Sequence, residues 1–341
     1  MFIAHVARQL LKQPVAVLDM CAAPGGKSTA LIASLPQGSM LVSNEPVRQR
    51  AQILLENIQK WGYPGCLVTN NYPEAFRGSR LQFDVVVCDV PCSGEGMFRK
   101  EAEAVAQWTP ELVSRCAGLQ RSIVEAAWEC LRPGGLLMYS TCTFNTEENE
   151  ENVAWMVRRL GAEPVGIDKE ASWGIEGSLL AGTDLPVCRF IPGLIRSEGL
   201  FMAVLRKPGD GSATPRSRIA DTVRKRLNTL ADGTLQAVVK GKEAIPHPAE
   251  ALRTDFDTNR FATVDTDYAT AMAYLRRESI VLPPDTPRGI VVITFMNHPL
   301  GFAKNLGNRA NNLFPQEWKI KSTHIPTDYE TIFRPAEPHT H

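Results

Sequence analysis

Short apolar runs alternate with segments of helical periodicity from the start of the chain to about residue 207. The runs are bounded by turn residues, as expected of buried strands, and they lie at residues 15–19, 40–44, 66–69, 83–89, 136–140 and 200–205. Helical periodicity covers residues 27–35, 48–61, 110–130 and 147–160. Strands separated by helices of this length predict right-handed βαβ units. We therefore expect an α/β chain with a doubly wound parallel sheet.

The pattern changes after this region. Residues 208–215 read Pro-Gly-Asp-Gly-Ser-Ala-Thr-Pro, a composition typical of a linker. Beyond them lie a basic segment at 216–226 and a β-rich run at 289–295, which predict a smaller α+β or β-barrel module. We expect a first domain at residues 1–207, the linker at 208–215, a second region at 216–330 and a loose tail at 331–341.

Composition excludes several classes of protein. The chain is 44% hydrophobic and 22% charged, which is ordinary for a globular protein and excludes a disordered or collagen-like one. Apolar runs fall short of the roughly 18–20 residues that span a bilayer, and the first residues lack a cleavage-site pattern, so we expect a cytoplasmic protein without a membrane partner. The eight cysteines are scattered, which predicts reduced thiols rather than a disulfide framework.

The 37 Lys and Arg residues balance 37 Asp and Glu residues, and a neutral chain at first argues against a nucleic-acid partner. The basic residues are clustered, however. Residues 216–226 contain five basic residues and one acidic residue, and so do residues 288–321. Because attraction to RNA depends on local patches, the neutral total does not exclude an RNA partner.

The loop at residues 19–29 lies between the first predicted strand and the first predicted helix, where open parallel sheets bind ligands. It reads Asp-Met-Cys-Ala-Ala-Pro-Gly-Gly-Lys-Ser-Thr, and its small residues let a ligand approach the backbone closely. The end of this loop is similar to a phosphate-binding P-loop, but Cys21 stands where that motif has its first glycine. Glu45 follows the second strand, where a carboxylate accepts hydrogen bonds from ribose hydroxyls. A nucleoside-type ligand is therefore favoured over a plain turn.

Two cysteines follow two other strands at the same predicted sheet edge. Cys92 lies in the segment Asp-Val-Pro-Cys-Ser-Gly-Glu-Gly that begins at Asp89, and Cys142 lies in Ser-Thr-Cys-Thr-Phe. Both loops are rich in Gly, Ser and Thr and lack histidine, so we expect no metal site. We expect the other cysteines outside the glycine loop to be small buried hydrophobic residues: Cys66, Cys88, Cys116, Cys130 and Cys188.

A thiol beside a nucleoside-type cofactor suggests covalent catalysis. Carbon C5 of a pyrimidine is a poor nucleophile, but addition of a thiolate to C6 makes C5 enamine-like and able to attack a methyl donor. An acid must then stabilise charge at N3, and a base must remove the C5 proton. Asp89 is placed to hydrogen-bond the edge of the ring, and the second cysteine can assist release. Spacing alone does not say which cysteine attacks.

Three segments resemble motifs of the RNA cytosine-C5 methyltransferases of the NOL1/NOP2/Sun family. They are residues 19–29, residues 89–96 and the run Ser-Thr-Cys-Thr-Phe-Asn-Thr-Glu-Glu-Asn-Glu at 140–150, and the resemblance covers residues 15 to about 207. It implies a Rossmann-like methyltransferase sheet, with Cys142 as the nucleophile and Cys92 as the residue that helps release product. DNA cytosine methyltransferases use the Pro-Cys thiol for attack instead. S-adenosylmethionine is the implied cofactor, bound by Cys21, Ala22, Ala23, Pro24, Gly25, Gly26, Lys27, Glu45 and Asp89.

The C-terminal region resembles the PUA-like RNA-binding end of the bacterial small-subunit rRNA branch of this family. The similar segments lie at residues 276–278, 289–292 and 300–312. The resemblance implies RNA as partner, most simply 16S rRNA, and no obligate protein partner is evident. Implied phosphate contacts are Lys304, Arg309, Lys319 and Lys321, and implied base contacts are an exposed Trp318 or Phe314. The alternatives are a tRNA cytosine-C5 methyltransferase, a P-loop NTPase and a non-catalytic RNA-binding assembly factor.

Two features depart from the family pattern. The family usually has an acidic residue after the third strand that contacts the adenine end of the cofactor, but this chain has Tyr72 there. We expect Asn71 to replace or supply that contact. Family members also carry an N-terminal RNA-binding segment, whereas Met1 stands about a dozen residues before the first strand, so we expect that segment to be missing.

Overall fold

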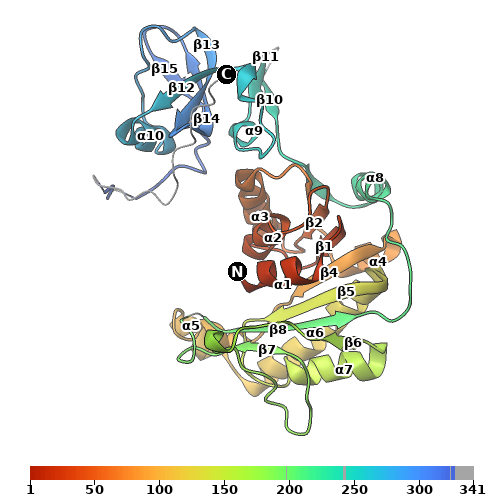
Figure 1. The fold of residues 1–341 in the computed structure, drawn as a ribbon. Coiled ribbons are helices and arrows are strands. Elements are labelled where there is room, and N and C mark those ends of the chain that lie inside the picture. The colour runs from red at the N-terminus through yellow and green to blue at the C-terminus, as the bar shows by residue number, and fades with distance from the viewer. Residues whose placement is uncertain (197, 241–242, 323, 327–341) are drawn as a thin grey trace. The chain divides into compact units, whose positions relative to one another are not determined.

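The computed structural model describes residues 1–196, 198–240, 243–322 and 324–326. Contacts between Cα atoms divide the chain into two compact units. The first unit comprises Met1–Ile58 and Gly65–Gly233, and the second comprises Gln59–Pro64 and Thr234–His341 (Figure 1). The predicted tail at residues 331–341 lies outside the described residues.

A nine-stranded sheet forms the centre of the first unit. Its parallel part runs in the order β3 (Cys66–Thr69), β2 (Met40–Asn44), β1 (Ala16–Asp19), β4 (Phe83–Asp89) and β5 (Leu131–Thr141). Strand order reverses beside β1, and such a switch point is where open α/β sheets form a ligand crevice. The doubly wound arrangement that the sequence predicted is confirmed.

The edges of this sheet are antiparallel, which differs from the parallel sheet that was predicted. Strand β8 (Leu200–Arg206) runs antiparallel to β5 and pairs with β6 (Glu163–Val165) and β7 (Cys188–Phe190). A parallel strand needs a crossover connection, usually a helix. Among the described residues between β6 and β8, the short 3-10 helix η2 (Ala171–Trp173) is the only helix, so the chain returns in the opposite direction.

Several helices pack around the sheet in the positions that periodicity predicted. Helix α6 (Pro110–Cys130) packs on β4 and β5, and it begins where Thr109 Oγ1 accepts a hydrogen bond from Leu112 N (3.1 Å). The other helices before residue 200 are α1 (Phe2–Leu10), α2 (Gly26–Ile32), α3 (Arg48–Trp61), α4 (Pro73–Ser79), α5 (Ala102–Gln107) and α7 (Glu150–Leu160). Periodicity placed the start of α7 at residue 147, but residues 147–149 belong to the loop that carries the candidate site.

The first unit extends beyond its predicted end at residue 207. Helix α8 (Arg216–Arg226) buries its apolar side chains in the core of this unit, and β9 (Thr229–Asp232) pairs antiparallel with β3. Thr214 fixes the preceding segment, because Gln82 N donates to Thr214 Oγ1 (2.9 Å). The basic segment at residues 216–226, which forms α8, therefore belongs to the first unit and not to the second, because its apolar side chains pack in the core of the first unit.

The second unit contains a four-stranded sheet. Its order is β12 (Ala262–Thr266), β13 (Gly289–Phe295), β14 (His298–Asn305) and β15 (Ala310–Asn312), and only the β12–β13 pair is parallel. Its remaining elements are β10 (Ala237–Lys240), β11 (Glu243–Pro246), α9 (Pro248–Ala251), η3 (Thr258–Arg260) and α10 (Tyr268–Leu275). This arrangement confirms a separate α+β module. In the part of the chain that the structure describes, every helix is too short or too polar to cross a membrane.

Candidate active site

The loops after β1, β2, β4 and β5 meet at the carboxyl edge of the parallel strands in the first unit. Lys27 Nζ lies 2.8 Å from Asp89 Oδ2, and Ser140 Oγ donates to Asp89 Oδ1 (2.7 Å). Cys92 and Cys142 face each other, with their Sγ atoms 3.2 Å apart. The structure thus brings the predicted lysine, carboxylate and two thiols to one edge.

The glycine loop is held in place by side chains of α3. Gly25 has φ +109°, in the left-handed region that favours glycine, and an added Cβ would lie 3.2 Å from Leu54 Cδ1. Arg50 donates to Ala23 O (3.0 Å), and Asn57 donates to Pro24 O (2.8 Å). Because α3 holds the backbone of the loop through these contacts, the small residues of the loop form a preformed surface.

Two buried carboxylates beside this loop each have an oxygen without a hydrogen bond. Asp19 Oδ2 accepts from Ser28 Oγ (2.6 Å), whereas Asp19 Oδ1 has no partner. Glu45 Oε1 accepts from Val47 N (3.0 Å), whereas Glu45 Oε2 has only a 3.5 Å ion-pair contact with Arg50. An unpaired buried acceptor is unfavourable. Both oxygens therefore fit a ligand that brings donors, such as ribose hydroxyls or an ammonium group.

Burial raises the pKa of Asp19 to about 7, although the hydrogen bond from Ser28 opposes this shift. The carboxyl group is therefore ready to lose a proton when a cation binds beside it. Lys27 differs. Burial alone would lower its pKa, but the ion pair with Asp89 outweighs that effect and leaves the pKa of Lys27 raised. Lys27 is therefore protonated in the resting protein and places a positive charge beside Asp89.

The two thiols differ in their electrostatic surroundings. The hydrogen bond from Cys92 lowers the pKa of Cys142, and the charge of Lys27 acts in the same direction against burial and Asp89. The same hydrogen bond raises the pKa of Cys92, as do burial and the charge of Glu148. The surroundings therefore favour Cys142 as the thiolate and Cys92 as the thiol that donates to it, a distinction that spacing alone could not make.

The remaining cysteines are mostly buried, as predicted. Burial raises the pKa of both Cys66 and Cys130 to about 12, and it also raises the pKa of Cys21 far above the usual range of a thiol. Cys21 therefore contributes a small side chain to the glycine loop and is not a nucleophile. Cys116 differs from the prediction, because it is only half-buried on α6.

The amide of Asn71 is already used within the protein. Asn71 Nδ2 donates to Asn228 O (3.2 Å), and Asn71 Oδ1 accepts from Asn228 N (3.0 Å). Tyr72 is 71% exposed. Asn71 therefore fixes the turn between α8 and β9, and the prediction that it supplies an adenine contact receives no support from this arrangement.

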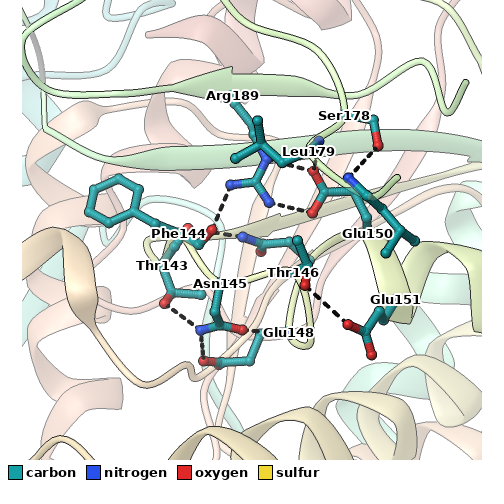
Figure 2. Close-up of polar contacts among 12 residues, drawn as sticks. Thr143, Phe144, Asn145, Thr146, Glu148, Glu150, Glu151, Ser178, Leu179 and Arg189 are labelled. Atoms are coloured by element: carbon teal, nitrogen blue, oxygen red, sulfur yellow. Dashed lines mark hydrogen bonds and ion pairs between the residues drawn. The ribbon is translucent and has the colours of Figure 1, made fainter. Parts of the chain in front are cut away.

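Three polar residues near the thiols were quoted within the motifs but were given no role. Glu95 follows Cys92, whereas Asn145 and Glu148 follow Cys142. Figure 2 shows Asn145 between Thr143 and Glu148. The available signal was the presence of acidic residues in both cysteine loops, Glu95 in the first and Glu147 and Glu148 in the second. Only the tertiary structure shows which donors face these carboxylates.

The predicted base contacts of the second unit lie partly inside it. Phe314 is only 7% exposed and packs against Tyr274, with ring centroids 5.4 Å apart, so the prediction of an exposed Phe314 is wrong. Trp318 is half-buried, and Lys60 Nζ lies 5.5 Å from the centre of its ring. Of the predicted phosphate contacts, Arg309 and Lys321 are exposed, whereas Lys304 and Lys319 are half-buried.

Comparison with known proteins decides the family. Residues 10–206 match the family described as 16S rRNA methyltransferase RsmB/F. The chain belongs to the RsmB/F family. Residues 261–320 match a second family, the Methyltransferase RsmF PUA domain. Both the predicted methyltransferase family and its PUA-like C-terminal module are confirmed, and a P-loop NTPase is excluded.

Individual relatives agree with this assignment. The chain is 29% identical over 354 residues to the Ribosomal RNA small subunit methyltransferase F of Cronobacter sakazakii, and 31% identical over 358 residues to that of Klebsiella pneumoniae. Each match covers 89% of this chain and 73% of the relative. Among solved structures, NSun6 from Pyrococcus horikoshii with SFG has a TM-score of 0.53 and 28% identity, over 61% of this chain and 51% of that chain.

Proposed function

We propose that this RsmB/F family member transfers a methyl group from S-adenosylmethionine to C5 of a cytosine in 16S rRNA. The observation that carries the proposal is the pair of thiols 3.2 Å apart beside the Lys27–Asp89 ion pair, at the same sheet edge as the glycine loop. The family supports methyl transfer to rRNA, and the names of the relatives favour the small ribosomal subunit over tRNA.

The residues around the glycine loop fit S-adenosylmethionine. Glu45 Oε2 would accept hydrogen bonds from ribose hydroxyls, and Asp19 Oδ1 would face a cationic group. When bound, this cofactor supplies the methyl group as an electrophile. The similar NSun6 from Pyrococcus horikoshii was solved with SFG, an analogue of S-adenosylmethionine. The glycine loop would contribute backbone contacts from residues 21–27.

Cys142 attacks C6 of cytosine as a thiolate, because Cys92 and Lys27 both favour its ionised form. A bond forms between Cys142 Sγ and C6, and the electron pair of the C5–C6 double bond moves toward N3. Asp89 lies at the ring edge in this arrangement, where Lys27 and Ser140 orient its carboxylate. Because Asp89 accepts a hydrogen bond on each carboxylate oxygen, the proton that neutralises N3 would come from Lys27 and pass through Asp89.

Cys92 removes the C5 proton after methyl transfer. Before attack, its hydrogen bond to Cys142 raises the pKa of Cys92. Once Cys142 is bonded to C6, it no longer carries a negative charge that this hydrogen bond stabilises. Cys92 then releases its proton to water more readily and accepts the proton from C5. The electron pair of the C5–H bond forms the C5–C6 double bond, the C6–S bond breaks, and Cys142 leaves as a thiolate. The proton on N3 would return to the Asp89–Lys27 pair, which leaves a neutral 5-methylcytosine.

The target base must leave its stack, because an A-form helix hides C6 from a thiol at the sheet edge. The second unit would supply RNA contacts that hold the flanking strand. Its exposed basic residues Arg309 and Lys321 support this role.

The two thiols can be tested separately in the full chain with 16S rRNA and radiolabelled cofactor. We expect Cys142→Ala to abolish methyl transfer and adduct formation, and Cys92→Ala to accumulate an adduct that survives denaturing gel electrophoresis. Cys116→Ala, on the half-buried surface of α6, is the matched control. Methyl transfer by Cys142→Ala would refute the assignment of the nucleophile. Modification of tRNA but not 16S rRNA would favour the alternative substrate, and RNA binding without transfer by the unaltered chain would favour an assembly factor.

A further inference from the structure

Each of the two cysteine loops contributes a buried carboxylate to the other. Glu95, in the loop after β4, accepts hydrogen bonds from Phe144 N (2.6 Å) and Asn145 N (2.9 Å) in the loop after β5. Glu148, in this second loop, accepts from Ser93 N (3.0 Å) in the first. Glu95 is 8% exposed and Glu148 is fully buried. The two loops are therefore tied in both directions.

Asn145 joins the two carboxylates. Its Nδ2 atom lies 3.0 Å from Glu95 Oε1. The same atom lies 2.8 Å from Glu148 Oε1 (Figure 2), and Asn145 Oδ1 accepts from Glu148 N (2.9 Å). A backbone hydrogen bond from Gly96 N to Cys142 O (2.8 Å) adds a direct tie to the predicted nucleophile. The separation of the thiols thus depends on a connected set of hydrogen bonds.

In all their described hydrogen bonds, the side-chain oxygens of Glu95 and Glu148 act as acceptors. Trp108 Nε1 donates to Glu95 Oε1 (3.0 Å), and Gln120 Nε2 donates to Glu148 Oε2 (2.7 Å). A carboxylate satisfies all these donors, whereas the isosteric amide of glutamine would turn its own N–H groups toward some of them. Replacement by glutamine is therefore a local perturbation with little change in volume.

Glu148 also sets the charge around Cys92. It hydrogen-bonds the residue next to Cys92, and its described side-chain partners are neutral donors. The ammonium group of Lys27 lies instead on the side of Cys142, beside Asp89. A negative charge on Glu148 disfavours a second negative charge on Cys92. Tyr139 also faces this side, through a hydrogen bond from Tyr139 Oη to Glu148 O (2.6 Å).

We propose that Glu95 and Glu148 are positioning residues for the thiol pair: together they fix the Cys92–Cys142 separation, and Glu148 keeps Cys92 as the protonated member. The proposal rests on the proposed function, because it takes Cys142 as the nucleophile. It predicts that the two carboxylates determine which thiol ionises, an effect that a purely structural role would not produce.

The test compares Glu148→Gln, Glu95→Gln and the control Glu151→Gln in the full chain. Glu151 lies in the same acidic stretch, but its described side-chain partner is Thr146 Oγ1 (3.0 Å) and not a residue of the loop that carries Cys92 (Figure 2). Iodoacetamide labelling across a pH series, read by peptide mass spectrometry, reports the ionisation of each cysteine without RNA or cofactor. Methyl transfer to 16S rRNA gives kcat and KM in parallel.

We expect the unaltered protein and Glu151→Gln to label at Cys142, with a midpoint below about 8.5, the usual value for a free thiol. In Glu148→Gln, part of the label should move to Cys92, and the Cys142 midpoint should rise. In Glu95→Gln, the separation of the two thiols is no longer fixed, so the Cys92–Cys142 hydrogen bond should weaken. The Cys142 midpoint should therefore rise in this variant too. Misplacement of the nucleophile should lower kcat by roughly 10- to 100-fold in both variants, with little change in KM.

The proposal would be overturned if both glutamine variants had the same cysteine labelling and the same kcat as the unaltered protein. If either variant fails to fold, Asn145→Ala, at a half-buried residue that joins both carboxylates, should show the same rise of the Cys142 midpoint, and an unchanged midpoint would overturn the proposal. Labelling needs no substrate, so the two proposals can fail separately. Shifted labelling without methyl transfer by the unaltered protein would support the carboxylate roles and refute the proposed function. Normal transfer with unshifted labelling would refute only the carboxylate roles.

Discussion

The buried ion pair between Arg189 on β7 and Glu150 at the start of α7 supports the loop that carries Cys142. Arg189 is 1% exposed, and Glu150 is completely buried. Figure 2 shows the guanidinium group facing both carboxylate oxygens of Glu150 while Nη1 donates to Phe144 O (2.7 Å). Leu179 N also donates to Glu150 (3.0 Å). One arginine thus connects an edge strand, a helix start and the active-site loop.

Arg189→Met retains much of the side-chain volume but leaves Glu150 as a buried carboxylate without its cation. Removing one partner of a buried pair costs about 3–5 kcal/mol. The lost hydrogen bond to Phe144 O adds about 1 kcal/mol. We therefore expect the free energy of unfolding to fall by roughly 4–6 kcal/mol, which at about 2–4 °C per kcal/mol lowers Tm by roughly 8–24 °C.

A second substitution separates the loss of charge pairing from the loss of packing. Arg189→Met combined with Glu150→Leu removes both charges, and replacement of a buried pair by apolar residues is often neutral or stabilising. We expect the double variant to regain about 2–3 kcal/mol of the free energy of unfolding that Arg189→Met loses. The loss that remains would come from the backbone groups of Phe144 and Leu179, which have lost their side-chain partners.

Urea unfolding followed by circular dichroism measures these differences. Arg224→Met, which removes an exposed pair with Asp232 on α8 and β9, is the control and should leave the unfolding midpoint nearly unchanged. A loss below about 1 kcal/mol for Arg189→Met, or a double variant no more stable than the single one, would show that the pair does not stabilise the loop.

Two further predictions concern the site itself. An alanine Cβ at residue 96 would lie 2.4 Å from Cys142 O, so Gly96→Ala should displace the nucleophile and lower kcat by about tenfold or more. Gly118→Ala, in open space on α6, is the control and should stabilise the helix by up to about 1 kcal/mol; unchanged kcat in Gly96→Ala would refute the steric argument. Burial raises the pKa of Asp19 to about 7, so in cofactor-free protein its stabilising contribution is complete below about pH 4 and is lost as pH rises through 7. Between pH 5 and pH 8, urea unfolding should show a smaller decline in the free energy of unfolding for Asp19→Asn than for the unaltered chain. Equal declines would contradict the raised pKa of Asp19.

Local patterns predicted much of the parallel core of the first unit. Helix α6 has a start signal in Thr109 and Pro110, and β4 is rich in β-branched residues at its centre (residues 85–87), so both were predicted with their observed bounds. The antiparallel edges and the membership of α8 in the first unit were not predictable in this way. They depend on pairings between residues far apart in the chain, such as Thr69 with Thr229, which local periodicity does not encode.

The same limit applies to the candidate site. The glycine loop and both cysteines lie in contiguous motifs, so the sequence was sufficient to predict them. Arg189 has no such signal, because its partner Glu150 lies 39 residues earlier and a single arginine in a polar segment is usually exposed. Likewise, the pKa of Cys142 is lowered by its hydrogen bond with Cys92 and by the charge of Lys27, and both of these residues come from other strand ends.

Strand β9 has a practical consequence for any attempt to isolate the methyltransferase unit. A chain cut at residue 207 would lose α8 and β9 together. Residues 67–69 of β3 would then present unpaired N–H and C=O groups along an edge, and the apolar surface that α8 covers would be exposed to water. Such an edge invites pairing between copies, so the shorter fragment should aggregate, whereas a fragment that continues through Gly233 keeps β3 paired with β9 and keeps the apolar surface under α8 covered.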